Sequence, residues 1–289
     1  MLALSLFLVA CSSPDPSDTA SDSGVAAEAD PLGGTAALAT VSGGACPAAL
    51  AEGGEVVFTA NGQERTVKVI LPESGPEGAP VVFVWHPLGA SAADMIRYLG
   101  LRAWAEDNGA VVIVPEALSG NMFEWDFWNG EDHDLVMYDD LRTCLIQDLG
   151  VDPTRFSTTG MSAGGLMTTF MGIQRGDTLA TIFPMSGGTD PVIPYTPPAG
   201  PFPALLFYGG ESDIWNGLDF QAATLAFAGE LTGDGHQVIV CNHEGGHTIP
   251  PEANQAATAW LTTHVFGQPG PFQDGNVEGL PGYCTAYAP

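Results

Sequence analysis

Short apolar runs alternate with stretches of helical periodicity along most of this chain. Residues 81–85 are apolar at every position, which is typical of a strand buried on both faces. By the same pattern, we expect strands at residues 81–85, 110–114, 156–159, 181–185, 204–208 and 237–241. Small and apolar residues recur at helical spacing at residues 91–108, 135–149, 163–173, 218–231 and 252–266.

The order of these elements predicts the fold class. Residues 55–58 and 65–71 flank Asn61-Gly62, a strong turn signal, so the domain should open with a β-hairpin. Strands and helices alternate after that hairpin. We therefore expect an α/β protein with a mostly parallel central sheet of about eight strands, flanked by helices on both faces.

The N-terminal part of the chain lacks this alternation. Its first ten residues are almost wholly apolar, and Leu8-Val9-Ala10-Cys11 resembles a bacterial lipobox. We expect residues 1–11 to be a lipoprotein-type signal peptide with lipidation at Cys11. An ordinary secretory signal is the alternative, since no Lys or Arg precedes the apolar run. Residues 12–45, rich in Ser, Asp, Ala and Gly, predict an acidic disordered tether, and residues 46–289 the folded domain.

This N-terminus predicts an exported protein. A cell-envelope lipoprotein is expected, in the outer membrane because Ser12 follows the lipidated residue, or else a secreted protein. The membrane would then be contacted only through a lipid anchor at Cys11. The sequence predicts no oligomeric state.

Charge narrows the classes of partner. The 289 residues include 34 acidic and 7 basic side chains, a formal net charge of −27. Nucleic acid and anionic membrane surfaces are excluded as partners, because both are bound through Lys and Arg. The same imbalance argues against a polyanionic substrate. We interpret the acidity as a solubility or salt-tolerance adaptation of the surface.

The chemistry is expected at the strand–turn–helix that contains Gly160-Met161-Ser162-Ala163-Gly164. This is the G-x-S-x-G pattern of a nucleophile elbow, in which a strained turn exposes the serine hydroxyl. Glycines two residues before and after Ser162 let the neighbouring strand and helix approach closely. Ser162 is therefore the predicted nucleophile.

A serine nucleophile needs a base and an acid, which should follow it in the order acid, then histidine. His247 lies in a glycine-supported loop after the last expected strand, and His243 in the same loop is the alternative. Asp213 follows the strand at residues 204–208 and is the expected acid. The alternatives to this acid are Asp190 first, then Glu211 and Asp219.

An oxyanion formed on the substrate needs two N–H donors. Ala163, the residue after the nucleophile, should supply one of them from the start of a helix. The other should come from the loop after the strand at residues 81–85. Because Pro87 has no N–H, Leu88 is the expected donor.

These motifs resemble the α/β-hydrolase fold, and within it the secreted esterases related to polyhydroxybutyrate depolymerases and feruloyl or acetylxylan esterases. The matching pieces are His86-x-x-Gly89, Asp152-Pro153-x-Arg155, the elbow, Gly210-x-x-Asp213 and Gly245-Gly246-His247-Thr248-x-Pro250. Two departures from that group are Pro87, where a glycine is usual, and Tyr208, where a histidine is frequent.

The resemblance implies a serine carboxylic-ester hydrolase with no cofactor. Its substrate would be a small-molecule or polymer-linked ester. A serine peptidase of the prolyl-oligopeptidase type is the alternative within the hydrolases. A non-catalytic surface binding protein on a hydrolase scaffold is the alternative from another class.

Aromatic residues gather in the segment at residues 121–129, which we call the aromatic segment. Trp125, Phe127 and Trp128 from this segment, and Trp215 beyond Asp213, are candidate walls of the substrate cleft. The alternative for the aromatic segment is a small apolar core under a long loop.

Five cysteines occur, and none has the spacing of a zinc ligand, so no metal site is expected. Lipidation of Cys11 leaves four cysteines for two disulfides in an oxidising compartment. We expect Cys241–Cys284, which would hold the C-terminal tail beside the last strand, and Cys46–Cys144. The rival pairing is Cys46–Cys284 with Cys144–Cys241.

Overall fold

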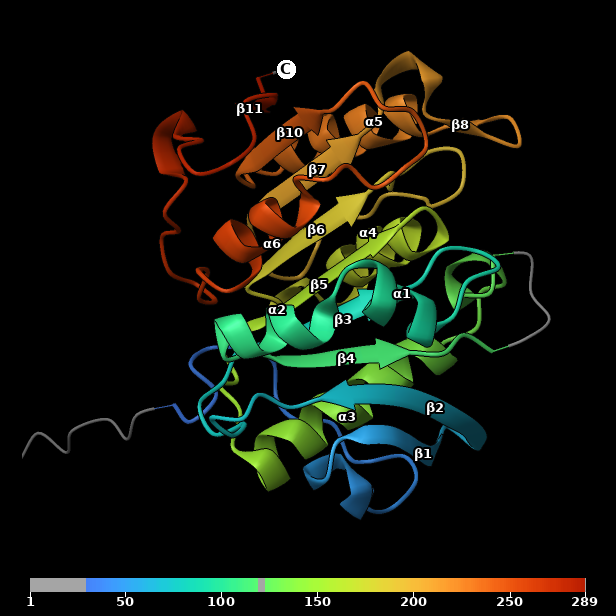
Figure 1. Cartoon of the computed structure of the whole chain (residues 1–289), viewed down its shortest axis with the longest axis vertical. Coiled ribbons are helices and arrows are strands. Elements are labelled where there is room, and N and C mark those ends of the chain that lie inside the picture. Colours follow the sequence, from blue (N-terminus) through green and yellow to red (C-terminus); the bar gives the residue numbers. More distant parts are fainter. Residues whose placement is uncertain (1–29, 119–122, 289) are drawn as a thin grey trace, which may run out of the picture. The chain divides into compact units, whose positions relative to one another are not determined.

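The computed structural model describes residues 30–118 and 123–288 of the chain (Figure 1). Its main folded unit begins at Pro31. The expected signal peptide, Cys11 and most of the expected tether lie outside the described residues.

A central sheet of nine strands organises the folded unit. Its strands, in spatial order, are β1 (Gly54–Ala60), β2 (Gln63–Ile70), β4 (Val111–Pro115), β3 (Val81–Trp85), β5 (Phe156–Met161), β6 (Thr181–Met185), β7 (Ala204–Tyr208), β10 (Val238–Asn242) and β11 (Cys284–Ala286). The six strands from β4 to β10 run parallel, and the edge pairs are antiparallel. The expected mostly parallel sheet is confirmed.

Helices cover both faces of this sheet, as expected. The α-helices are α1 (Ala92–Tyr98), α2 (Leu101–Asn108), α3 (His133–Leu149), α4 (Ala163–Arg175), α5 (Phe220–Gly233) and α6 (Ala253–Leu261). Short 3-10 helices lie at η1 (Ala48–Ala51), η2 (Asp126–Trp128), η3 (Gly176–Thr178), η4 (Gly210–Ser212) and η5 (Gln273–Gly275). A small hairpin, β8 (Ile214–Trp215) with β9 (Leu218–Asp219), projects beside β7.

Strand β3 shows why the central strands are apolar throughout. Successive side chains of a strand point to opposite faces of the sheet. Phe83 and Trp85 pack in one core with α3, α4 and α5, whereas Val82 and Val84 pack in the other with α1, α2 and α6. Figure 1 shows α1, α2 and α6 on the side of the sheet nearest the viewer.

The ninth strand departs from the expected number of about eight. Residues Cys284–Ala286 of the C-terminal tail pair antiparallel with β10, with Cys241 opposite Cys284. A strand this short carries no alternation that periodicity could detect.

The single helix expected at residues 91–108 is instead two helices. Gly100, with φ 61°, separates α1 from α2. Ser91 starts α1 with a capping box, in which its hydroxyl accepts from Asp94 N–H and the Asp94 carboxylate accepts from Ser91 N–H. The apolar periodicity continues across Gly100, so the sequence pattern does not predict that the helix is interrupted there.

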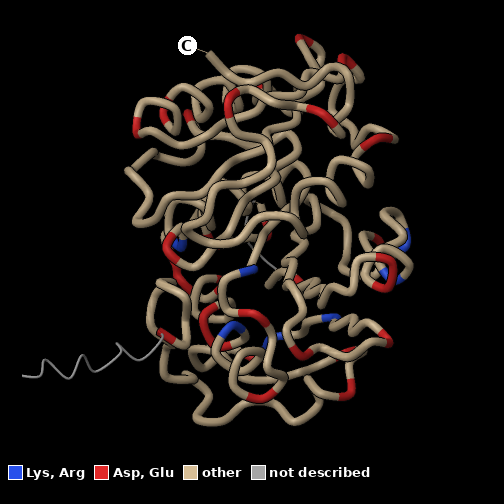
Figure 2. Tube along the Cα trace, turned by 90° about the vertical axis from the view of Figure 1, so that its left-hand side faces the viewer, with Lys and Arg blue, Asp and Glu red and all other residues tan. Residues whose placement is uncertain are grey.

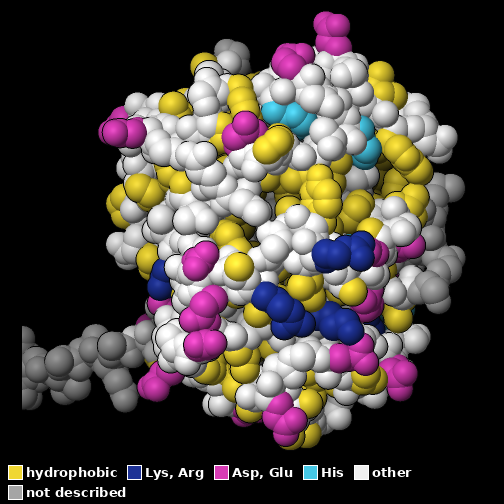
Figure 3. Space-filling model, viewed as in Figure 1, with side chains coloured by type: hydrophobic (Ala, Val, Ile, Leu, Met, Phe, Trp, Pro, Cys, Tyr) yellow, Lys and Arg dark blue, Asp and Glu magenta, His cyan; other side chains and the backbone are white. Residues whose placement is uncertain are grey.

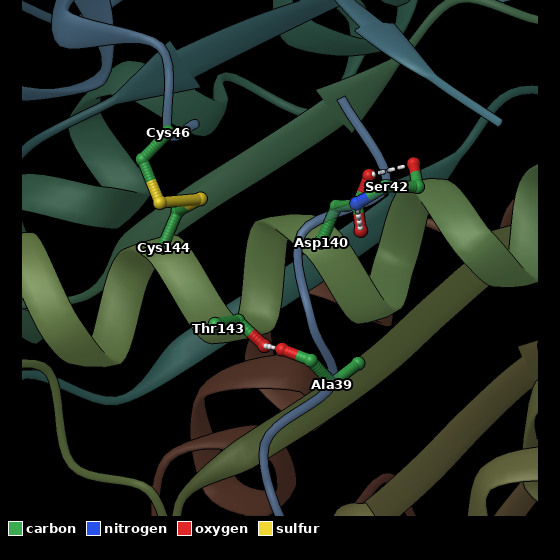
Figure 4. The surroundings of a disulfide bond; sticks show 6 residues. All are labelled: Ala39, Ser42, Cys46, Asp140, Thr143 and Cys144. Carbon is green, nitrogen blue, oxygen red and sulfur yellow. Dashed lines mark hydrogen bonds between the residues drawn. A yellow bond between two sulfur atoms is a disulfide. The ribbon is translucent and has the colours of Figure 1, made fainter. Parts of the chain in front are cut away.

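The folded unit starts before the expected boundary at Cys46. Thr35 is buried, and its hydroxyl accepts a hydrogen bond of 2.7 Å from the guanidinium of Arg142 on α3. Further links to α3 are drawn in Figure 4, namely the hydrogen bonds from Ser42 to Asp140 and from Thr143 to Ala39, and the disulfide Cys46–Cys144. The described end of the expected tether is thus held mainly by polar contacts, which an apolar pattern does not signal.

Both expected disulfides are present in the structure. Cys46 is joined to Cys144 on α3, with their Cα atoms 5.4 Å apart. Cys241 at the end of β10 is joined to Cys284 on β11, with a Cα–Cα distance of 4.0 Å. The rival pairing is absent. Among the described residues, no helix has the length and apolarity needed to cross a membrane.

We expect the first disulfide to contribute strongly to stability. Its cysteines lie 98 residues apart in sequence, so the bond restricts a long loop of the unfolded chain. The double variant Cys46→Ala/Cys144→Ala should lower the free energy of unfolding by about 2–4 kcal/mol. Urea-induced unfolding measures this loss, and a midpoint equal to that of the wild type would contradict it.

Candidate active site

The candidate residues gather at the carboxyl ends of the parallel strands. Ser162 follows β5, Asp213 follows β7 and His247 follows β10. The arrowheads of these strands point to the same side of the sheet in Figure 1. In open α/β sheets, this edge is where ligands bind.

Ser162 occupies a strained turn between β5 and α4. Its φ is 58° and its ψ is −119°, a conformation that costs a residue with a side chain of order 1–3 kcal/mol. A Cβ on Gly160 would lie 2.4 Å from Gly164 O, and one on Gly164 would lie 2.0 Å from Trp85 O. Both glycines of the motif are therefore required by close contact with backbone.

The structure brings together the three residues that the sequence predicts. His247 Nε2 lies 2.9 Å from Ser162 Oγ, and His247 Nδ1 lies 2.7 Å from Asp213 Oδ1. A carboxylate can only accept, so Nδ1 carries the proton and Nε2 is left to accept from the hydroxyl of Ser162. We call this chain of hydrogen bonds the serine–histidine–aspartate array.

The alternative residues do not join this array. His243 Nδ1 accepts from Gly245 N–H within its own loop. Burial lowers the pKa of His243, so this ring is neutral in more of the pH range than an exposed histidine. Asp190, the alternative acid, is exposed and lies in a loop after β6.

Two donors that sequence reasoning missed hold the carboxylate of Asp213. Its Oδ2 accepts a hydrogen bond of 2.9 Å from Ser186 Oγ and one of 2.8 Å from Gly209 N–H. The Asp213 side chain is fully buried, so these donors offset the loss of water around a charged group. In the sequence, the position of a small polar residue directly after β6 could have indicated that Ser186 lies near the site.

The loop of His247 is held by backbone and by an aromatic ring. Gly246 N–H donates to Gly209 O over 2.9 Å, and a Cβ on Gly209 would lie 2.0 Å from Gly246 O. The ring of Phe220, at the start of α5, stacks on His247 with centroids 4.6 Å apart. These contacts restrict the imidazole to one orientation.

The curated proteins similar to this chain include a feruloyl esterase and a poly(3-hydroxyalkanoate) depolymerase. Feruloyl esterase D of Neurospora crassa is 29% identical over 181 residues, which cover 55% of this chain and 61% of that protein. Poly(3-hydroxyalkanoate) depolymerase C of Paucimonas lemoignei is 30% identical over 129 residues, 41% of this chain and 30% of that protein. The chain thus spans less than two thirds of either relative. No protein-family model matches it.

Solved structures decide the fold. That of pOPH has a TM-score of 0.68 at 21% identity, over 84% of this chain and 96% of that one. The S-formylglutathione hydrolase FrmB of Staphylococcus aureus has a TM-score of 0.57 at 16% identity, over 72% of this chain and 95% of that one. The chain has the α/β-hydrolase fold. The expected resemblance to feruloyl esterases and polyhydroxyalkanoate depolymerases is likewise confirmed.

A cleft of about 490 Å³ opens at the array of this hydrolase fold. Ser162 and His247 line it together with Leu88 from the loop after β3. Ala163 is the first residue of α4, directly after the serine. Within the described part of the chain, the amides of Leu88 and Ala163 donate no hydrogen bond, so both are available to a bound oxygen.

The four aromatic candidates separate into two groups. Trp215, on β8, lines the cleft and is 40% exposed. Trp125 and Phe127 do not line it but are buried in the main core, where Trp125 Nε1 donates to His86 O. Trp128 is exposed at the surface, outside the lining of this cleft. The structure therefore places Trp125, Phe127 and Trp128 outside the lining of this cleft, and Trp125 packs instead against the end of β3.

Tyr98, on the last turn of α1, is a lining residue that sequence reasoning missed. It is 65% exposed at the rim, so neither burial nor a motif marked it.

Among the described residues, no group of three or more His, Cys, Asp or Glu side chains could hold a metal ion.

The close approach at the elbow makes Gly164 the most sensitive glycine of the motif. Gly164→Ala should lower the free energy of unfolding by about 3 kcal/mol, because a backbone carbonyl has to move. Gly233→Ala is the matched control, since a Cβ there, at the end of α5, meets no atom within 4 Å. Thermal melting of both variants measures the effect, and an unchanged melting temperature for Gly164→Ala would contradict it.

Proposed function

We propose that this protein is a serine carboxylic-ester hydrolase. The observation that carries the proposal is the array of Ser162, His247 and Asp213, with distances of 2.9 Å and 2.7 Å, on a strained elbow at the mouth of a cleft. A hydroxyl is a weak nucleophile unless an adjacent base takes its proton. This arrangement supplies the base and the acid that orients it.

The proposed reaction runs through an acyl-enzyme. His247 Nε2 accepts the proton of Ser162 as its Oγ attacks the ester carbonyl, and Asp213 stabilises the imidazolium. The N–H groups of Leu88 and Ala163 stabilise the oxyanion. His247 then protonates the leaving alcohol, and a water molecule activated by the same ring releases the acid.

The proposed substrates are acyl esters of plant-wall or polyester type. The names of the two relatives, a feruloyl esterase and a poly(3-hydroxyalkanoate) depolymerase, support this class. The cleft also suits an acyl chain, since Met95, Met161 and Ile249 are among its lining residues. Figure 3 shows apolar side chains gathered beside histidine side chains on this face.

The proposed location is outside the cytoplasm. Two disulfides support export, because such bonds persist in oxidising compartments. Anchoring through a lipid on Cys11 is part of the same proposal and rests on the lipobox pattern alone.

Labelling and turnover test the proposal together. A fluorophosphonate probe should modify Ser162, and the purified protein should hydrolyse p-nitrophenyl butyrate. Ser162→Ala is the control and should abolish both signals. Labelling with peptide cleavage and no ester turnover would favour the serine peptidase, and absence of labelling would leave the binding protein.

The three residues should act as a unit. Ser162→Ala and His247→Ala are each expected to lower kcat by about 10⁴-fold or more, and the double variant should lose little further activity. Asp213→Asn should lower kcat by about 10⁴-fold, because an amide favours the wrong tautomer of His247. Steady-state kinetics measure these losses, and additive effects in the double variant would contradict the assignment.

Ser186 is expected to position Asp213 without touching the substrate. Ser186→Ala removes a hydrogen bond to a buried carboxylate, which is worth about 1.5–3 kcal/mol. We expect kcat to fall by about tenfold with KM unchanged. Ser186→Cys, which retains a weak S–H donor and is not β-branched at this position of positive φ, should recover part of the rate. A fall confined to thermal stability would show that Ser186 is merely structural.

A further inference from the structure

The seven basic residues of the chain fall into two groups, one of buried or partly buried side chains and one on a single part of the surface. Four of them are engaged by partners within the folded unit. These pairs are Arg65 with Asp134, Arg142 with Thr35, Arg155 with Thr262 and Arg175 with Asp139.

The other three basic residues lie together. Lys68, Arg97 and Arg102 line a hollow of about 590 Å³ beside α1 and α2, which we call the basic hollow. Figure 3 shows basic side chains gathered on this face, whereas Figure 2 shows acidic residues scattered over the described part of the trace.

The basic hollow keeps an excess of positive charge. Lys68 pairs with Glu55, and Arg97 pairs with Asp94 over 2.8 Å. Arg102 forms no ion pair within the described part of the chain. Three cations therefore face two carboxylates, and one guanidinium is left for a ligand.

Arg97 also retains free donors. The Oδ2 atom of Asp94 is occupied by Ser91 in the capping box of α1, and only Oδ1 accepts from Arg97 Nη2. The Arg97 side chain is 82% exposed. Since a guanidinium has five N–H donors, most of them remain available to a second carboxylate.

Arg97 connects the basic hollow to the array. It lines the basic hollow with Lys68 and Arg102, and it also lines the cleft with Ser162 and His247. The cleft and the basic hollow lie on different sides of α1, and Arg97 is the lining residue that they share. A ligand that extends from the serine over the rim of the cleft at α1 would meet Arg97 first.

Within a few ångströms of the surface, a bound anion is affected more by nearby side-chain charges than by the net charge of the protein. The net charge of −27 repels anions, but at physiological ionic strength charges beyond about 8 Å are largely screened. A bound carboxylate therefore responds mainly to the guanidinium groups that it touches. The net charge of the protein therefore does not exclude a polyanionic ligand from this part of the surface.

We infer that the basic hollow binds carboxylate groups of the ester substrate, at a distance from the bond that is cleaved. This inference rests on the proposed esterase function and narrows its substrate class. Guanidinium groups bind carboxylates through paired hydrogen bonds, which gives both charge and orientation. The carboxylate is supplied by the free end of an oligoester or by uronic acid units of an acidic polysaccharide.

Two pairs of probes that differ only in charge test the inference and separate these sources. One pair is a hydroxybutyrate trimer ending in a carboxylate and its carboxamide. The other is an acetylated galacturonic acid oligomer and its uronamide. Wild-type kcat/KM should be higher for the acid in one pair, which identifies the source. Arg97→Gln/Arg102→Gln should lower that acid-to-amide ratio by about tenfold, because the lost cations weaken binding of the acid more than binding of the amide.

Arg175→Gln is the charge-matched control, because it removes a cation outside both cavities and should leave the ratio unchanged. Raising the salt concentration should reduce the ratio of the wild type toward that of the double variant. Turnover of p-nitrophenyl butyrate with no acid preference in either pair overturns the basic hollow as a subsite and leaves the esterase intact. Absence of turnover for every ester overturns the proposed function itself.

Discussion

The close approach of α4 to the ends of β3 and β6 is the constraint on which the site depends. A Cβ on Gly164 would lie 2.0 Å from Trp85 O, and one on Gly165 would lie 2.3 Å from Met185 O. Three adjacent strands and one helix therefore meet with no side chain between them. Only this contact lets the first turn of α4 begin directly at Ser162, so that the free amides of the helix lie beside its hydroxyl.

A second close backbone contact between glycines lies on the other side of the array. Gly209 and Gly246 touch backbone to backbone, which joins the loop after β7 to the loop after β10. The parallel register of these strands, with Tyr208 opposite Asn242, brings the two loops level. Acid and base thus come from neighbouring loops with a shared backbone contact, whereas the nucleophile comes from a separate strand. Rigid strand ends, and not the loops alone, set the distances of the array.

The residues that sequence could identify are those whose role follows from chain order. Ser162 sits directly after a recognisable strand, Asp213 and His247 lie in the loops that follow two others, and parallel strand ends share one edge. Contacts between distant segments left no such signal. Ser186 is an ordinary serine until the fold places it beside Asp213, and the polar packing of residues 31–45 on α3 has no apolar pattern. The aromatic segment was misplaced because its composition fits a cleft wall and a core equally well.

Burial of the aromatic segment has a consequence for the site. Asp126 and Asp134 exchange hydrogen bonds of 2.8 Å and 3.1 Å, each carboxylate accepting from the other residue's N–H. Arg65 on β2 pairs with Asp134 over 2.6 Å, and both side chains are buried. Burial raises the pKa of Asp134, because it disfavours the charged carboxylate. The guanidinium of Arg65 offsets this cost. Through Trp125, which donates to the end of β3, this ion pair supports the loop that carries Leu88. Strand β2, which lies second from one edge of the sheet and far from Ser162 in sequence, therefore helps to position the proposed oxyanion donor.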